Sequence, residues 1–199
     1  MVIRVVAFLS LTMFPAILSY RQEPSTDLRQ ADVYAIYSLM MANPQTSHAP
    51  AEEETFLIAS TTEPAYPQTP CVAVPPEYHS SLQEILADYG IRGNTPATLI
   101  RAFNIPKPYR LLTAEEAQDF VEIRSLRPTP YPNAKEFLQR AHDLYQFGDV
   151  YFIAARTVAL TSLSTYCGSL CGRSDRKVFV KTETGRWEER RWVTCNTVY

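Results

Sequence analysis

Apolar residues recur at helical spacing through the first three quarters of the chain. One such stripe runs from Val33 to Met41, between capping residues at 25–27 and a stop at Asn43-Pro44, and it predicts a helix. A capping box at Thr113-Ala-Glu-Glu116 predicts the start of another. The same spacing, with its start and stop residues, predicts further helices at residues 75–90, 94–103 and 133–148.

From residue 149 the pattern changes to runs of branched and aromatic residues, which favour strands. Four strands are predicted at 150–155, 158–167, 178–181 and 187–193, and Thr184-Gly185 predicts a tight turn between the last two. Runs of helices followed by runs of strands indicate an α+β class. We therefore expect N-terminal short helices packed on a C-terminal antiparallel meander of about four strands.

Residues 44–77 form a Pro-rich region that contains seven prolines and the acidic run at 52–54. Within it, the stretch at 55–61 has the composition of a strand and offers a fifth one. A linker between two domains is the alternative interpretation, but the apolar stretch and Cys71 both argue against it. We expect residues 20–199 to form a single domain.

The N-terminus has the order of a secretory signal peptide. Arg4 gives a positively charged start, and residues 5–18 form an uncharged, mostly apolar run that is too short to cross a membrane. We expect residues 1–19 to be a cleaved signal peptide, and no transmembrane segment in the mature form. The protein would then be exported, to a periplasm or to the outside of the cell; a buried N-terminal helix or strand is the alternative.

The chain has a formal net charge of −2. Residues 20–149 carry ten basic and seventeen acidic side chains, whereas residues 150–199 carry eight and four. This balance is not that of a strongly basic nucleic-acid binder, so we expect no nucleic-acid partner. An unknown protein or a small ligand is the partner class that is left.

Four cysteines are present, and an even count in an exported chain indicates two disulfides. Three connectivities are possible. We favour Cys167–Cys171 with Cys71–Cys195, because the first two residues lie close in sequence and leave the others to each other. A metal site is the lesser alternative, since none of the three histidines, His48, His79 or His142, stands in a paired ligand motif.

The segment Cys167-Gly-Ser-Leu-Cys-Gly172 follows a predicted strand and precedes Lys181-Thr-Glu-Thr-Gly-Arg-Trp187. This arrangement resembles a family of uncharacterised exported bacterial proteins with a strand, a CGxLCG corner and a KxxxGxW hairpin. The resemblance covers roughly residues 148–195. It implies export and a disulfide-bonded fold, and it implies no activity, cofactor or catalytic residue.

Several side chains are of types that occur in catalytic or binding sites, but their spacing does not match a known motif. His79 precedes Ser80 and Ser81, but no nucleophile elbow surrounds them, and we interpret all three as surface residues. His142 and Asp143 are sequence neighbours, which do not face each other on a helix. The carboxylates at 115, 116, 119 and 122 fit the solvated polar face of a helix. Arg190 and Trp192 alternate with Arg191, so a strand would divide this cluster between two faces.

No phosphate-binding loop, dinucleotide fingerprint, zinc signature or calcium loop occurs in the chain, and we predict no cofactor, metal or catalytic residue. The leading hypothesis is a non-enzymatic exported domain that binds a partner. A small extracytoplasmic hydrolase with a Ser/His or carboxylate site is the alternative. A thiol-redox protein is disfavoured, because Cys167 and Cys171 lack the C-x-x-C spacing.

Overall fold

A computed structural model describes residues 26–42, 55–63, 72–73, 75–92, 95–125, 135–169, 171–191, 193–194 and 197–198. The expected signal peptide and most of the Pro-rich region lie outside the described residues. The helices are α1 (Thr26–Ala42), η1 (Pro76–Tyr78, a 3-10 helix), α2 (His79–Arg92), α3 (Ala114–Arg124) and α4 (Glu136–Arg140). The strands are β1 (Phe56–Ala59), β2 (Val72–Ala73), β3 (Tyr109–Leu112), β4 (Leu144–Phe147), β5 (Tyr151–Phe152), β6 (Val158–Tyr166), β7 (Arg173–Lys181), β8 (Trp187–Arg190), β9 (Val193–Thr194) and β10 (Thr197–Val198).

The described strands form an eight-stranded sheet and a separate two-stranded pair, β2 with β9. The main path of the sheet runs β10-β7-β6-β4-β1-β3, with β5 beside β6 and β8 beside β7. The pairings of β4 through β8 are antiparallel, whereas β1 is parallel to both β3 and β4. The predicted α+β class is thus confirmed, but the helices are not all N-terminal to the sheet: β1, β2 and β3 lie among them.

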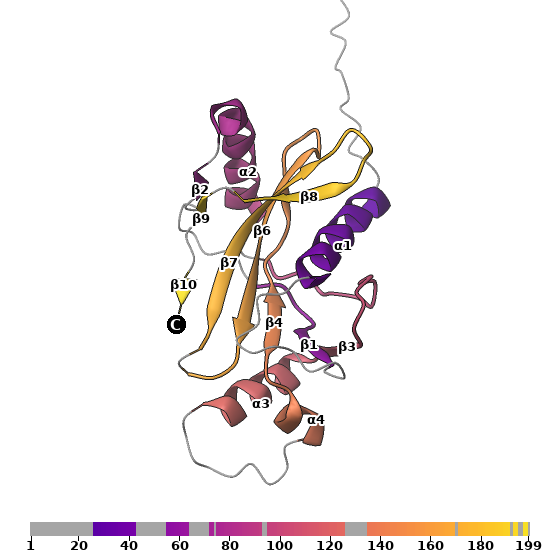
Figure 1. The fold of residues 1–199 in the computed structure, drawn as a ribbon, viewed down its shortest axis with the longest axis vertical. Coiled ribbons are helices and arrows are strands. Elements are labelled where there is room, and N and C mark those ends of the chain that lie inside the picture. Colours follow the sequence, from indigo (N-terminus) through magenta and orange to yellow (C-terminus); the bar gives the residue numbers. More distant parts are fainter. Residues whose placement is uncertain are drawn as a thin grey trace, which may run out of the picture.

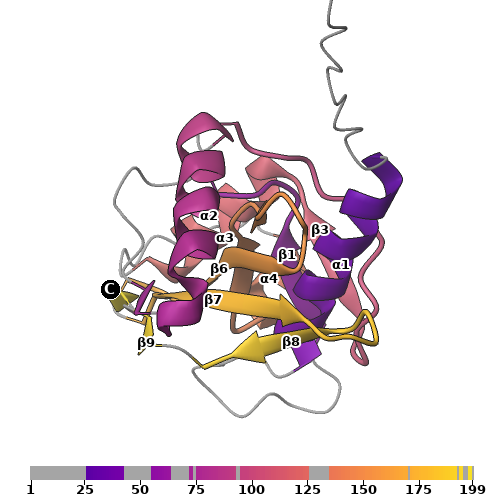
Figure 2. The same ribbon diagram turned by 90° about the horizontal axis from the view of Figure 1, so that it is seen from above.

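Helices cover both faces of the sheet (Figures 1 and 2). On one face, which we call the α1 face, α1 packs on side chains such as Phe147 and Phe179 in the largest core cluster. On the opposite face, the α2 face, Ile85 of α2 and Phe120 of α3 lie in two separate clusters. Because side chains alternate along a strand, the same strands supply residues to both layers.

The short stretch expected as a fifth strand is β1, and it lies inside the sheet rather than beside it. All four of its residues are buried. Phe56 and Ile58 pack on the α1 face, and Leu57 and Ala59 pack on the other. A parallel strand with both faces covered reads as a continuous apolar run, which explains its sequence.

Two helices predicted from apolar spacing are wrong. Residues 95–103 are not helical, because their backbone pairs with the chain that leaves β1: Leu99 N–H donates to Ser60 and Thr62 N–H to Ala97. The helix expected at 133–148 ends at Arg140, and the next apolar residues form β4 between β1 and β6. A short apolar run is compatible with the 3.6-residue repeat of a helix and with the two-residue repeat of a strand. Hydrogen bonding to segments that are distant in sequence decides which of the two forms.

Other local signals are confirmed. Thr113 caps α3 through its hydroxyl, and Glu116 closes the reciprocal hydrogen bond of the capping box. The turn between β7 and β8 places Gly185 at φ +80°, a region that favours glycine. α1 and α2 begin and end within a few residues of their expected bounds.

Gly148 lies where three elements meet closely. Its carbonyl accepts hydrogen bonds from the Tyr37 hydroxyl of α1 at 2.9 Å and from the Thr161 hydroxyl of β6 at 3.0 Å. A Cβ atom at this position would lie 2.2 Å from Ser162 Oγ and 3.2 Å from the Ser162 backbone nitrogen. The site therefore has no room for a side chain.

We expect Gly148→Ala to lower the free energy of unfolding by about 1–3 kcal/mol, because overpacking displaces β6 or α1. Gly90→Ala is the matched control: it lies in α2 with nothing within 4 Å of the added atom, and should stabilise by about 0.5–1 kcal/mol. Urea unfolding measures both. Equal effects from the two changes would contradict the assigned packing.

Candidate functional site

The outer side of α1 carries the large apolar side chains that the described structure leaves exposed. These are Leu28 and Leu39 of α1, which are 61% and 36% exposed, and Ile100 of the neighbouring segment, which is 50% exposed. Leu28 and Leu39 are eleven residues apart, which is close to three helical turns, so they lie on one stripe of the helix. Grouped apolar exposure of this kind marks interaction surfaces more often than single exposed residues do.

A hollow of about 540 Å³ lies between this stripe and the segment at 100–104. Two hydrogen bonds fix its walls: Ile100 N–H donates to the Tyr34 hydroxyl at 2.6 Å, and Asn104 N–H donates to Ser38 Oγ at 2.8 Å. Burial raises the pKa of Tyr34, more than the Ile100 hydrogen bond lowers it, so the hydroxyl keeps its proton at neutral pH. The lining residues are Gln30, Ala31, Tyr34, Ala35, Ser38, Ile100, Ala102 and Asn104.

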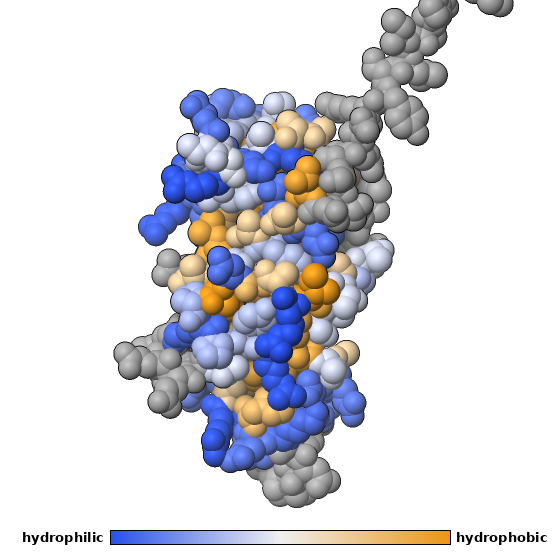
Figure 3. Space-filling view, turned by 90° about the vertical axis from the view of Figure 1, so that its right-hand side faces the viewer, coloured by the Kyte–Doolittle hydropathy of each residue, from blue (hydrophilic) through white to orange (hydrophobic). Residues whose placement is uncertain are grey.

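A second hollow, of about 350 Å³, lies on the other side of the same stripe and shares Ala31 with the first. Its lining includes Asp32, Arg156 and Lys181. The two hollows and the stripe between them form one continuous surface, which we call the α1 surface. Figure 3 shows this side of the molecule, where apolar patches alternate with polar ones.

Asp32 anchors the second hollow. Its carboxylate accepts hydrogen bonds from Trp187 Nε1 at 2.9 Å and from Lys181 Nζ at 2.8 Å, and it also pairs with the Arg156 guanidinium. Burial opposes ionisation, but these three donors together hold the pKa of Asp32 below its ordinary value. The carboxylate is therefore charged at neutral pH and serves as the structural partner of two cations.

Among the described side chains that line the two hollows, positive charges outnumber negative ones. Asp32 is one carboxylate against Arg156 and Lys181, so one positive charge is left beside the second hollow. On the other side, Arg101 is exposed next to Ile100 and lies over the ring of Tyr109. The apolar stripe thus has a cation on each side, which favours a ligand that is apolar in the middle and acidic at its flanks.

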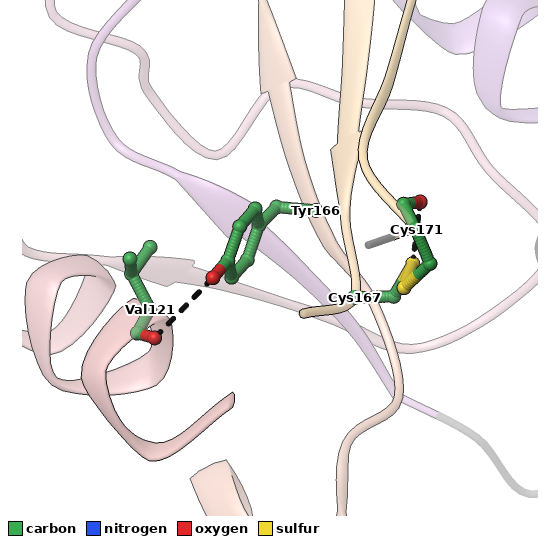
Figure 4. Close-up of a disulfide and its surroundings, with 4 residues drawn as sticks. All are labelled: Val121, Tyr166, Cys167 and Cys171. Atoms are coloured by element: carbon green, nitrogen blue, oxygen red, sulfur yellow. Dashed lines mark hydrogen bonds between the residues drawn. A yellow bond between two sulfur atoms is a disulfide. The ribbon is translucent and has the colours of Figure 1, made fainter. Parts of the chain in front are cut away.

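Of the predicted disulfides, Cys167–Cys171 is present at the corner between β6 and β7, with the two Cα atoms 5.6 Å apart (Figure 4). The neighbouring Tyr166 hydroxyl points to the Val121 carbonyl of α3, at 3.5 Å. Cys71 and Cys195 lie outside the described residues. The corner lies at the ends of β6 and β7 beside α3, where a Cβ atom at Gly168 would be 3.1 Å from the Arg124 carbonyl, and its residues line neither hollow, so it is no part of this site.

The structure does not bring the histidine and serine candidates together as a catalytic group. His79 and Ser80 are exposed at the start of α2, and no hydrogen bond joins the two side chains. His142 is exposed in the connection before β4 instead of on a helix. His48 and Trp192 lie outside the described residues. In the described part of the chain, no three His, Cys, Asp or Glu residues gather as they would around a metal ion.

The carboxylate face expected on α3 is solvated except at Glu116, which is buried. Its carboxylate accepts from Lys135 Nζ at 2.6 Å, from Arg110 at 3.0 Å and from the Thr113 backbone N–H at 3.1 Å. The Lys135 hydrogen bond, working against burial, holds the pKa of Glu116 below its ordinary value. Glu116 therefore joins β3, α3 and the start of α4, and its role is structural.

Sequence reasoning missed the α1 surface. The available signal was that Leu28, Ala35 and Leu39 form a second apolar stripe on α1, beside the one assigned to the core.

No family model, curated protein or solved structure matches this chain. Among the described residues, no helix has both the length and the apolar character to cross a membrane.

We expect Asp32→Asn to lower the free energy of unfolding at pH 7 by about 2–4 kcal/mol, because it leaves two half-buried cations without their counter-charge. The stabilisation comes from the ionised carboxyl, whose folded-state pKa is lowered. It should therefore be fully present above about pH 4, the ordinary pKa of an aspartate in the unfolded chain, and be lost as the pH falls further through the lower folded-state pKa. Thermal melts across pH 2–8 measure this, with Glu183→Gln in the exposed β7–β8 turn as the control. A constant difference from pH 2 to pH 8 would contradict it.

Proposed function

We propose that this protein is an exported, non-enzymatic module that binds an apolar, acidic-flanked segment of a partner protein on its α1 surface. The observation that carries the proposal is that large apolar residues of the described chain are exposed together around α1. Ile100 and Leu28 each line one of two hollows that share Ala31, and Leu39 lies on the same helical stripe as Leu28. An apolar centre with a polar, charged rim is the anatomy of a protein interface.

The surface supplies the groups that such a segment requires. Ala31 and Ala35 are small, so a backbone or an apolar side chain can approach the helix closely between the two hollows. The protonated Tyr34 hydroxyl accepts from Ile100, and its own hydrogen is available to a partner carbonyl. Arg101 on one side and Lys181 on the other favour acidic flanks, which also raise the association rate.

A random twelve-residue peptide display library tests the proposal. Selection on the purified protein should enrich peptides with an apolar centre and Asp or Glu at both sides. Ala35→Asp should weaken these peptides about tenfold or more, because it places a buried negative charge at the centre of the contact. Ala87→Asp, the same change on the exposed face of α2, should leave binding unchanged.

Two results would refute the proposal: no enrichment over the starting library, or enriched peptides that bind both aspartate variants equally. Thermal melts of both variants serve as the folding control. Since each alanine is exposed on its helix, neither change is expected to unfold the protein.

Export and the second disulfide belong to the same proposal. The described strands β2 and β9 are antiparallel, with Val72 opposite Thr194. Residue 71 precedes the first of these and residue 195 follows the second, so the proposed Cys71–Cys195 bond would continue the same register. Directly opposed residues of an antiparallel pair have Cα atoms about 4.5–5.5 Å apart, within the range of a disulfide.

We expect non-reducing peptide mapping of the protein from an export-competent host to recover two crosslinks, Cys167–Cys171 and Cys71–Cys195. Reduction should lower the melting temperature mainly through the second bond, because it closes the longer loop and restricts the unfolded chain more. The Cys167→Ser/Cys171→Ser double variant, which retains only the longer crosslink, is the matched control. A Cys71–Cys167 crosslink, or free thiols at 71 and 195, would disprove the pairing.

A further inference from the structure

The α2 face of the sheet carries a band of polar side chains between its two apolar clusters. Gln146, Ser164 and Ser174 lie side by side across β4, β6 and β7, and Ser162 lies opposite Arg176 in the next row. All five are partly exposed. One apolar cluster, beneath α3, includes Leu144 and Tyr166 at one end of the band, and the other, beneath α2, includes Leu160 and Val178 at its other end.

Glu63 completes this polar band. It continues the direction of β1, and its N–H donates to the Phe147 carbonyl at 2.7 Å, beside β4. Ser164 Oγ donates to Glu63 Oε2 at 2.9 Å and lies 3.0 Å from Ser174 Oγ. The carboxylate accepts no other hydrogen bond from the described chain, although it has room for about four. Burial raises the pKa of Glu63 above its ordinary value, more than the Ser164 hydrogen bond lowers it.

Arg176 is the cation of the polar band. Strand alternation sends it to the same face as Ser174, roughly 7 Å further along β7. It makes no ion pair or hydrogen bond within the described chain. Its positive charge acts on the Tyr89 hydroxyl of α2, whose pKa it lowers against the opposite effect of burial. A guanidinium has five donors in a planar fork, which fits a carboxylate with two parallel hydrogen bonds.

We propose that this polar band binds small zwitterions, molecules that carry both a carboxylate and an ammonium group, of which free α-amino acids are the simplest. Arg176 takes the carboxylate, and Glu63 with Ser164 takes the ammonium. A half-buried charge without a counter-charge is costly in the free protein, and a ligand with the complementary pair of charges removes both costs at once. The proposal goes beyond the α1 surface, because the polar band is on the opposite face of the sheet.

The charges of the polar band favour this ligand class over its neighbours. A dianion such as a phosphate ester would meet Arg176 but also the Glu63 carboxylate, which repels it. A simple amine would leave Arg176 unpaired, and a simple carboxylic acid would leave Glu63 unpaired. The serines and Gln146 provide neutral hydrogen-bond donors and acceptors between the two charged groups.

L-Alanine and its two half-molecules test the proposal directly. Propionate lacks the ammonium group of L-alanine, and ethylamine lacks its carboxylate. L-Leucine, L-serine, L-glutamate and L-lysine vary the side chain. Each compound is titrated into the purified full chain, and two-dimensional amide NMR spectra report both affinity and location. We expect saturable binding by one or more of the amino acids, with the largest shifts at the amides of residues 63, 164 and 174, and at least about tenfold weaker binding by the two half-molecules.

Glu63→Gln and Arg176→Gln should each weaken amino-acid binding about tenfold or more. Glu183→Gln and Arg186→Gln remove the same charges from the exposed β7–β8 turn and should change nothing. Glu63→Gln is expected to fold well at neutral pH, since it removes a buried carboxylate whose ionised form is disfavoured. Its melting temperature should equal or exceed that of the unmodified protein.

Three outcomes would overturn the proposal. The first is that none of the amino acids binds, and the second is that propionate or ethylamine binds as tightly as L-alanine. The third is binding that survives both Glu63→Gln and Arg176→Gln. None of these outcomes bears on the α1 surface, which the peptide selection tests separately.

Discussion

The Asp32 carboxylate is the interaction on which the arrangement of α1 and the sheet depends. Its three donors come from three separate places: Arg156 from the turn after β5, Lys181 from the end of β7, and Trp187 from the start of β8. One residue of α1 therefore fixes the helix against the end of the long hairpins. Arg156 has φ +54°, a conformation that costs an L-residue about 1–2 kcal/mol, and its pairing with Asp32 offsets that cost.

The same carboxylate decides the electrostatics of the α1 surface. Because Asp32 balances only one of its two cations, the described lining of the second hollow keeps one positive charge beside an apolar stripe. Burying Trp187 against Asp32 also removes an aromatic residue that the sequence places among arginines. Trp187 therefore belongs to the core of the described structure, and Lys181 and Arg156 border the second hollow.

The sheet separates two chemically different surfaces. On the α1 face, apolar side chains fill the core and the exposed stripe lies outside the helix. On the α2 face, α2 and α3 cover only the two ends of the long strands, and the rows between them are polar. β1 connects these surfaces, since it anchors the segment at 95–104 on one side and positions Glu63 on the other. Its central place explains why a four-residue strand matters to both proposed sites.

The sequence by itself determined the features that depend on neighbours along the chain. The stripe of α1, the capping box at Thr113, the Thr184-Gly185 turn and the Cys167–Cys171 corner each involve residues within a few positions of one another. Only the tertiary structure decided the rest. Leu99 and Leu144 lie in apolar runs too short to distinguish a helix from a strand, and hydrogen bonds to Ser60 and β6 settled the matter. The polar band draws Glu63, Gln146, Ser164 and Arg176 from four segments, and no spacing in the chain records that the sheet places them on one face.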